Sequence, residues 1–76
     1  MYVSVCYYKE EFDAYGGRDY SYTTELPLNV GDKVIAPTAK NPEQRAMVTA
    51  VDIPEPPFAC KAITRYYVPE PAGGET

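Results

Sequence analysis

The sequence predicts an all-β domain, a small five-stranded barrel of the SH3-like or OB-like kind with a disordered C-terminal tail. Short segments rich in β-branched and aromatic residues are separated by turn residues, and none of them keeps a clean helical period. A chain of 76 residues is long enough for one compact core only. Because an open sheet of so few short strands would leave two edges in solvent, we expect a single closed domain over residues 1–68 and a tail at residues 69–76.

The first part of the chain contains two predicted strands with a loop between them. Residues 2–8 and residues 20–24 alternate with a period of two, which is typical of strands that are buried on one face. Residues 9–19 are polar and contain two glycines, which predicts a loop. The side chains expected to share a face are Val3, Val5 and Tyr7 in the first strand, and Tyr20, Tyr22 and Thr24 in the second.

Two further strands are predicted in the middle of the chain. Leu28 and Val30 are spaced to point together into a core, and Gly31 supplies the positive φ of the turn that follows. A short strand rich in β-branched residues comes next and ends at Pro37. Residues 45–53 are long enough for two helical turns, but their β-branched residues and the proline that follows favour a strand.

The last predicted strand is the least regular of the five. Residues 54–57 form a proline-rich, extended linker, and residues 58–68 supply the apolar segment after it. Alternation would give this strand two mixed faces. One face carries Lys61, Ile63, Arg65 and Tyr67, and the other carries Cys60, Ala62, Thr64 and Tyr66.

One stretch of the chain resembles part of a known family. Tyr22 leads through a Val-Gly-Asp turn at residues 30–32 into a strand with the pattern Val-x-x-Pro at residues 34–37. This arrangement is similar to the N-terminal DNA-binding domain of the primosomal helicase family, over at most half of the chain. The family continues with a Phe-Gly pair and a basic residue, whereas Thr-Ala-Lys follows here at residues 38–40. The resemblance implies a DNA-binding barrel without ATP-driven activity.

Metal and thiol chemistry have few candidate residues. Two cysteines and no histidine cannot supply the four ligands of a structural zinc site, so we expect neither a metal nor a cofactor. Cys6 and Cys60 lie in apolar settings that favour buried free thiols, although neighbouring first and last strands would allow them to pair. No signal peptide and no apolar run approaching roughly 20 residues is visible. We therefore expect a cytoplasmic protein that does not enter a membrane.

The absence of histidine also argues against an enzyme. Triads of the Ser-His-Asp and Cys-His kinds are impossible, and the usual general base near neutral pH is missing. Glu10 with Asp13, and Asp52 with Glu55, are conceivable acid–base pairs, but their polar surroundings indicate solvated surface. No glycine-rich phosphate-binding loop is present.

The chain is acidic, with seven Lys and Arg against eleven Asp and Glu and a net charge of −4. Duplex binders normally carry a basic stripe that displaces counterions from phosphates, and the basic residues here are scattered along the chain. The acidity is explained by solubility. The sharper alternative is an acidic surface that mimics DNA and inhibits a DNA-binding protein.

Tyrosine is the residue type that most suggests a binding surface, with eight copies and no tryptophan. Adjacent tyrosines in a strand place one ring on each face, so each Tyr-Tyr pair is expected to expose a ring. Exposed tyrosines anchor protein interfaces or stack on unpaired bases, whereas buried ones cover a small core. With the nearest cations, the predicted binding residues are Tyr7, Tyr8, Lys61, Arg65, Tyr66 and Tyr67.

These observations predict a non-enzymatic binding or adaptor module, of the sort that phages and mobile elements carry. It would engage a protein partner through the barrel surface or an open edge strand. The alternatives are a weak single-stranded nucleic-acid-binding barrel that uses the tyrosines with Lys61 and Arg65, and the acidic inhibitor that mimics DNA. Nucleic acid remains a possible partner that the net charge disfavours.

Overall fold

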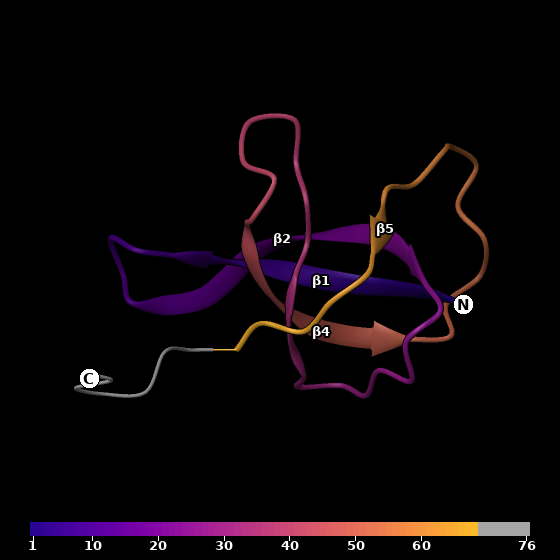
Figure 1. Ribbon diagram of the computed structural model, residues 1–76, viewed down its shortest axis with the longest axis horizontal. Helices are drawn as coiled ribbons and strands as arrows, with labels where there is room; N and C mark the ends of the chain where they lie inside the picture. Colours follow the sequence, from indigo (N-terminus) through magenta and orange to yellow (C-terminus); the bar gives the residue numbers. More distant parts are fainter. Residues whose placement is uncertain (69–76) are drawn as a thin grey trace.

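The computed structural model describes residues 1–68, in which every regular element is a β-strand (Figure 1). The strands are β1 (Tyr2–Lys9), β2 (Ala14–Thr24), β3 (Lys33–Ile35), β4 (Arg45–Val51) and β5 (Ala62–Ile63). The predicted all-β class is confirmed. The segment at residues 45–53, which is long enough for two helical turns, contains the strand β4, and the first half of this strand buries alternate residues. The tail predicted at residues 69–76 lies outside the described residues.

The strands form one sheet that closes almost completely into a barrel. Their order is β3-β4-β1-β2-β5, and all neighbours are antiparallel except β2 and β5. After β5 the chain crosses to β3, where Val34 and Tyr66 form a bridge and the amide of Tyr67 donates to the carbonyl of Lys33 at 3.0 Å. The last segment therefore contacts both edges of the sheet, and Figure 1 shows it in orange to yellow in front of the other strands.

The core lies between the inward faces of the strands, largely where the alternation predicted it. Val3 and Val5 are fully buried, Tyr22 is buried opposite Val3, and Thr24 is buried further along β2. Tyr20 pairs with Val5 and lies on the expected face, but it stays 38% exposed. The buried apolar cluster consists of Val3, Val5, Tyr22, Leu28, Val34, Ala36, Ala46, Val48 and Ile63.

The loop predicted at residues 9–19 is wrong, because β1 and β2 continue into a long hairpin with a short turn at its tip. Tyr8 pairs with Tyr15 across the hairpin, and their rings meet edge to face with centroids 5.2 Å apart. Such aromatic cross-strand contacts stabilise a hairpin despite its polar composition. Gly17, with φ of 90°, lies at a β-bulge within β2 instead of in a loop.

The segment before β3 confirms the turn and corrects one core assignment. Gly31 has φ of 97°, as the turn requires. Leu28 is buried, but Val30 is 63% exposed. The amide of Asp32 donates to the carbonyl of Asn29 at 3.1 Å, and the Asp32 carboxylate accepts from the Asn29 amide at 2.9 Å. Val30 lies inside this tight turn, so the strand period that aligned it with Leu28 does not hold there.

The fifth strand is much shorter than the prediction of residues 58–68. Only Ala62–Ile63 pairs with β2 as a strand, and the Thr24 hydroxyl donates to the carbonyl of Ile63 at 2.8 Å. Because the chain must leave β2 and cross to β3, a long alternation with two faces cannot develop. Before β5, Lys61 bonds to Thr23 of β2, whereas residues 58–60 run beside β2 without pairing with it.

We expect Tyr22→Phe to lower the free energy of unfolding at neutral pH by about 1–2 kcal/mol. The Tyr22 hydroxyl lies 2.7 Å from that of Tyr7 and donates to the carbonyl of Pro37 at 2.9 Å, and the substitution leaves both partly buried groups without this partner. Urea denaturation measures the change. Tyr20→Phe is the control, because the more exposed Tyr20 side chain has no hydrogen bond among the described residues.

The same substitution has a predicted pH dependence. Burial, and then the hydrogen bond with Tyr7, raise the pKa of the Tyr22 hydroxyl. Folding therefore favours the neutral hydroxyl. Its contribution to the free energy of unfolding is complete below the unfolded pKa of about 10 and declines as the pH rises above that value. The stability gap between the wild type and Tyr22→Phe should narrow above that pH. A constant gap would contradict the assignment.

Candidate functional site

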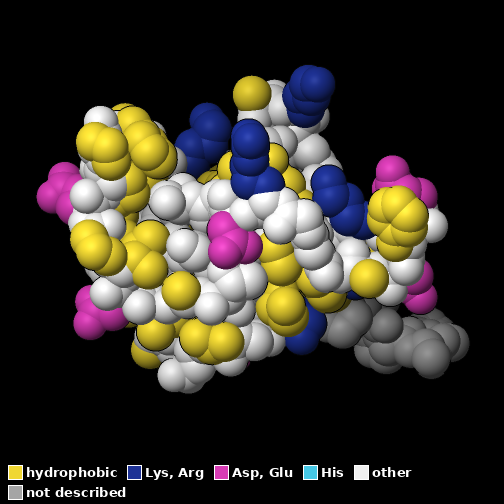
Figure 2. All heavy atoms as spheres, turned by 180° about the vertical axis from the view of Figure 1, so that it is seen from behind, with side chains coloured by type: hydrophobic (Ala, Val, Ile, Leu, Met, Phe, Trp, Pro, Cys, Tyr) yellow, Lys and Arg dark blue, Asp and Glu magenta, His cyan; other side chains and the backbone are white. Residues whose placement is uncertain are grey.

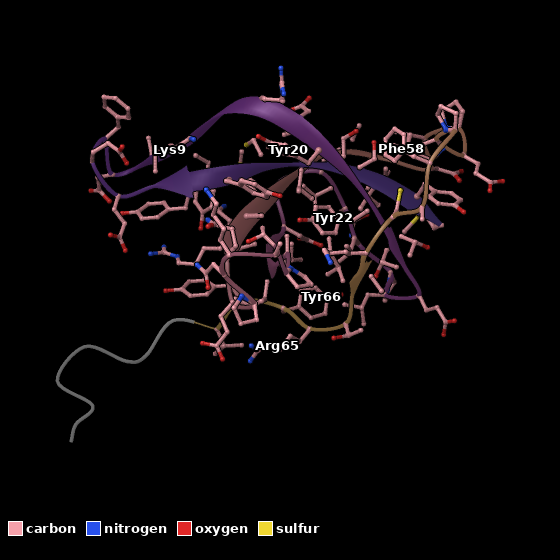
Figure 3. The ribbon with its side chains drawn as sticks, turned by 90° about the horizontal axis from the view of Figure 1, so that it is seen from above. Lys9, Tyr20, Tyr22, Phe58, Arg65 and Tyr66 are labelled. Carbon is pink, nitrogen blue, oxygen red and sulfur yellow. The ribbon has the colours of Figure 1, made fainter. Side chains whose placement is uncertain are left out.

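The six predicted binding residues lie in two regions instead of one. Four of them, Tyr8, Arg65, Tyr66 and Tyr67, lie where the chain crosses to β3 and around the start of β4. The other two, Tyr7 and Lys61, line a groove beside β2. Figure 3 shows Arg65 and Tyr66 on one side of the barrel and Phe58, which also lines the groove, on the opposite side. The structure therefore divides the predicted site.

In the first region, Arg45 occupies the aromatic surfaces that the sequence suggested for binding. Its guanidinium carbon lies 3.9 Å from the ring centroid of Tyr8 and 4.4 Å from that of Tyr67. Burial lowers the pKa of Arg45, but the neighbouring tyrosines Tyr15, Tyr67 and Tyr8 raise it above its usual value overall, so the group remains a cation. The cation–π contacts bind β1, β4 and the crossing segment to one another. Arg45 thus covers one face of the Tyr8 ring and one face of the Tyr67 ring, and a ligand cannot stack on these faces.

Arg65 and Tyr66 lie beside a hollow of about 880 Å³ that extends to Val68, the last described residue. The guanidinium of Arg65 is paired with the carboxylate of Glu43 at 3.2 Å, and both side chains remain mostly exposed. Tyr66 is 41% exposed. The charge of Arg65 is therefore partly compensated within the chain.

The second region is a groove of about 270 Å³, which we call the β2 groove. Its lining residues are Tyr7, Asp19, Tyr20, Ser21, Tyr22, Phe58, Ala59, Cys60 and Lys61. The groove exists because the amide of Thr23 donates to the carbonyl of Lys61 at 3.0 Å, while the residues before Lys61 diverge from β2. One wall is thus a strand and the other is an irregular segment.

The β2 groove has a rigid aromatic wall. The rings of Tyr7 and Tyr20 are stacked, with centroids 4.4 Å apart and planes 8° apart. The hydroxyl groups of Tyr7 and Tyr22 are hydrogen-bonded, and Tyr22 is fixed in turn by Pro37. Phe58, on the opposite wall, is 61% exposed (Figure 3). Fixed aromatic surfaces of this kind bind apolar side chains with little loss of conformational entropy.

The chemistry of the β2 groove suits binding. Burial and then the Tyr7 hydrogen bond raise the pKa of Tyr22, so this hydroxyl stays neutral near pH 7 and is a poor base. The groove holds one cation, Lys61, and one carboxylate, Asp19. Within residues 1–68, no three Cys, Asp or Glu side chains are arranged to hold a metal ion.

Two functional residues were missed by sequence reasoning. Tyr20 and Phe58 line the β2 groove, although neither is among the six predicted binding residues. Their sequence separation gave no signal that they would share a site. An exposed phenylalanine after a proline-rich linker is a weak signal that could have identified Phe58.

Arg45→Ala should lower Tm by about 5 °C, because it removes two cation–π contacts that join three segments. Thermal unfolding followed by circular dichroism measures the change. Arg65→Ala is the matched control and should shift Tm by only about 2 °C, because its partner Glu43 is exposed. Equal effects of the two substitutions would show that the aromatic contacts add nothing.

The two thiols should react at different rates. Both are free; Cys6 is 4% exposed and Cys60 is only partly buried, so the prediction of two buried thiols holds for Cys6 alone. Burial, and then the charge of Asp19, raise the pKa of Cys6, which lowers its thiolate fraction. We expect Ellman's reagent to modify Cys60 quickly and Cys6 only after unfolding. A Cys60→Ser variant that reacts as fast as the wild type would contradict this assignment.

The chain was compared with family models, curated proteins and solved structures. No family model, no curated protein and no solved structure matches it. The resemblance of residues 22–37 to the primosomal helicase family therefore stays a prediction. In the part of the chain that the structure describes, no helix is long and apolar enough to cross a membrane.

Proposed function

We propose that this chain is a non-enzymatic binding module that engages a protein partner through the β2 groove. The observation that carries the proposal is the contrast between the two regions of tyrosines. Near the crossing, Arg45 covers one face of Tyr8 and one face of Tyr67, whereas beside β2 the partly exposed Tyr20 and the exposed Phe58 line an open groove. An open, preformed aromatic groove is a common anchor site for a protein side chain.

Several features favour a protein over nucleic acid as the partner. A single-stranded binder needs free aromatic faces beside free cations. Arg45 is held between Tyr8 and Tyr67, and Arg65 is paired with Glu43. The chain as a whole carries a net charge of −4, which opposes a polyanion. These contacts weaken the alternative that the sequence suggested.

An acidic inhibitor that mimics DNA would require a row of carboxylates along one face. Figure 2 shows carboxylates mainly at the two ends of the face that it presents, with Lys and Arg side chains in the part between them. On that face, the distribution favours the protein-binding module over the mimic.

The proposal includes two finer predictions from the sequence. The barrel is taken to be of the SH3-like or OB-like kind, both of which bind ligands on the barrel surface. The protein is taken to work in the cytoplasm, where its two free cysteines remain reduced.

A pair of binding experiments tests the protein-binding role. A displayed library of random peptides, selected against the immobilised full chain, should yield peptides whose binding competes with one another at one site. Fluorescence anisotropy of labelled single-stranded DNA and RNA should stay flat at low and at physiological salt. Saturable, salt-sensitive oligonucleotide binding would favour the nucleic-acid alternative, and a library without binders would oppose the proposal.

A further inference from the structure

The edge of β2 that faces the β2 groove has unpaired backbone groups. The amide of Thr23 bonds to Lys61 on the groove side of β2, whereas the amide of Thr24 bonds to Met1 on the β1 side. Because successive residues of a strand direct their backbone groups to opposite sides, Ser21 and Asp19 face the groove as Thr23 does. Neither of their amides has a hydrogen-bond partner in the described part of the chain.

The free edge is long enough for another strand. β2 runs from Ala14 to Thr24, but only Thr23 and Thr24 pair with β5, so among residues 1–68 the strand that pairs with residues 14–22 is β1 alone. An edge of this kind is a template for an added strand. The β2 groove lies directly beside it and can receive a side chain of that strand between Tyr20 and Phe58.

Exposed cations lie along this edge although the chain is acidic. Lys9, Arg18 and Lys61 are exposed, and within residues 1–68 none of them is paired with a carboxylate. The Lys9 side chain lies over the bulge, since its Cε is 3.5 Å from the position that a Cβ on Gly17 would occupy. Among the residues that the structure describes, Asp19 is the carboxylate that lines the groove.

We infer that the β2 groove binds an extended acidic segment of the partner, which adds as a strand to β2 at Asp19 and Ser21. The inference rests on the proposed protein-binding function and identifies the class of partner. Backbone pairing supplies the register, an apolar side chain fills the space between Tyr20 and Phe58, and the flanking carboxylates meet Lys61 and the cations near the bulge.

The probe is a nine-residue peptide of alternating Glu and Val with Phe at its centre, titrated into the ¹⁵N-labelled full chain. Amide shifts should change at Asp19, at Ser21 and over residues 58–61, and the Lys-for-Glu peptide should bind about tenfold more weakly. Amide hydrogen exchange gives a second readout. The amides of Asp19 and Ser21 should exchange about tenfold more slowly with bound peptide, because each gains a partner. Those of Tyr20 and Tyr22, which face β1, should not change.

Matched variants separate the groove from general surface effects. Phe58→Ser and Lys61→Glu should each weaken the binding of the acidic peptide about tenfold, because each removes one proposed contact. Phe12→Ser and Lys40→Glu change an exposed residue of the same type outside the groove and should bind as the wild type does. Since all four side chains are exposed, loss of folding is not expected, and circular dichroism checks it.

Several outcomes would overturn the inference. In the titration, these outcomes are the absence of saturable amide shifts, amide shifts confined to the region of Arg65 and Tyr66, and equal binding of the acidic and basic peptides. In the exchange experiment, the outcome is an unchanged rate of amide hydrogen exchange at Asp19 and Ser21. Self-association through the same edge, seen by sedimentation, would replace the acidic partner by a second copy of the chain. Library peptides that bind outside the groove would overturn this inference alone and leave the protein-binding function standing.

Discussion

The closure of the barrel by its last segment is the constraint on which the other features depend. This segment bonds to β2 through Lys61 and β5 at one end and to β3 through Tyr66 and Tyr67 at the other. Only a few residues of this segment therefore pair with each edge strand. One result is that Tyr67 reaches Arg45, and the other is that the preceding residues stand away from β2 and leave a groove. The covered and the open aromatic regions have this common origin.

The position of each cation matters more for recognition than the total charge. Arg45 is bound between tyrosine rings and Arg65 is paired with Glu43, so these two contribute to holding the closure together. Within residues 1–68, the exposed cations without such partners lie beside the free edge of β2 or in loops. These cations can act on a ligand beside them in an acidic chain, because charges separated by more than a Debye length are largely screened from one another.

A free strand edge is a hazard as well as a binding element, since it can pair with a second copy of the chain. β2 limits this hazard in two ways. The bulge at Gly17 interrupts a flat edge, and the Lys9 side chain lies over the bulge. Asp19 adds a charge beside the unpaired amide groups. The same features narrow the range of strands that can add there, so protection against aggregation and selection of a partner have one physical basis.

The sequence by itself determined the all-β class, the core positions Val3, Val5 and Tyr22, and the turn at Gly31, because alternation and positive φ are local properties. It missed the hairpin beyond Tyr8, whose cross-strand contacts outweigh its polar composition. The predicted binding residues lie in two regions because contacts between distant segments place them. Strand register brought Tyr8 to Arg45, and the bond of Lys61 to Thr23 brought the segment that carries Phe58 beside β2. Only tertiary structure decides such contacts, because they join residues far apart in the chain whose meeting depends on pairing and closure.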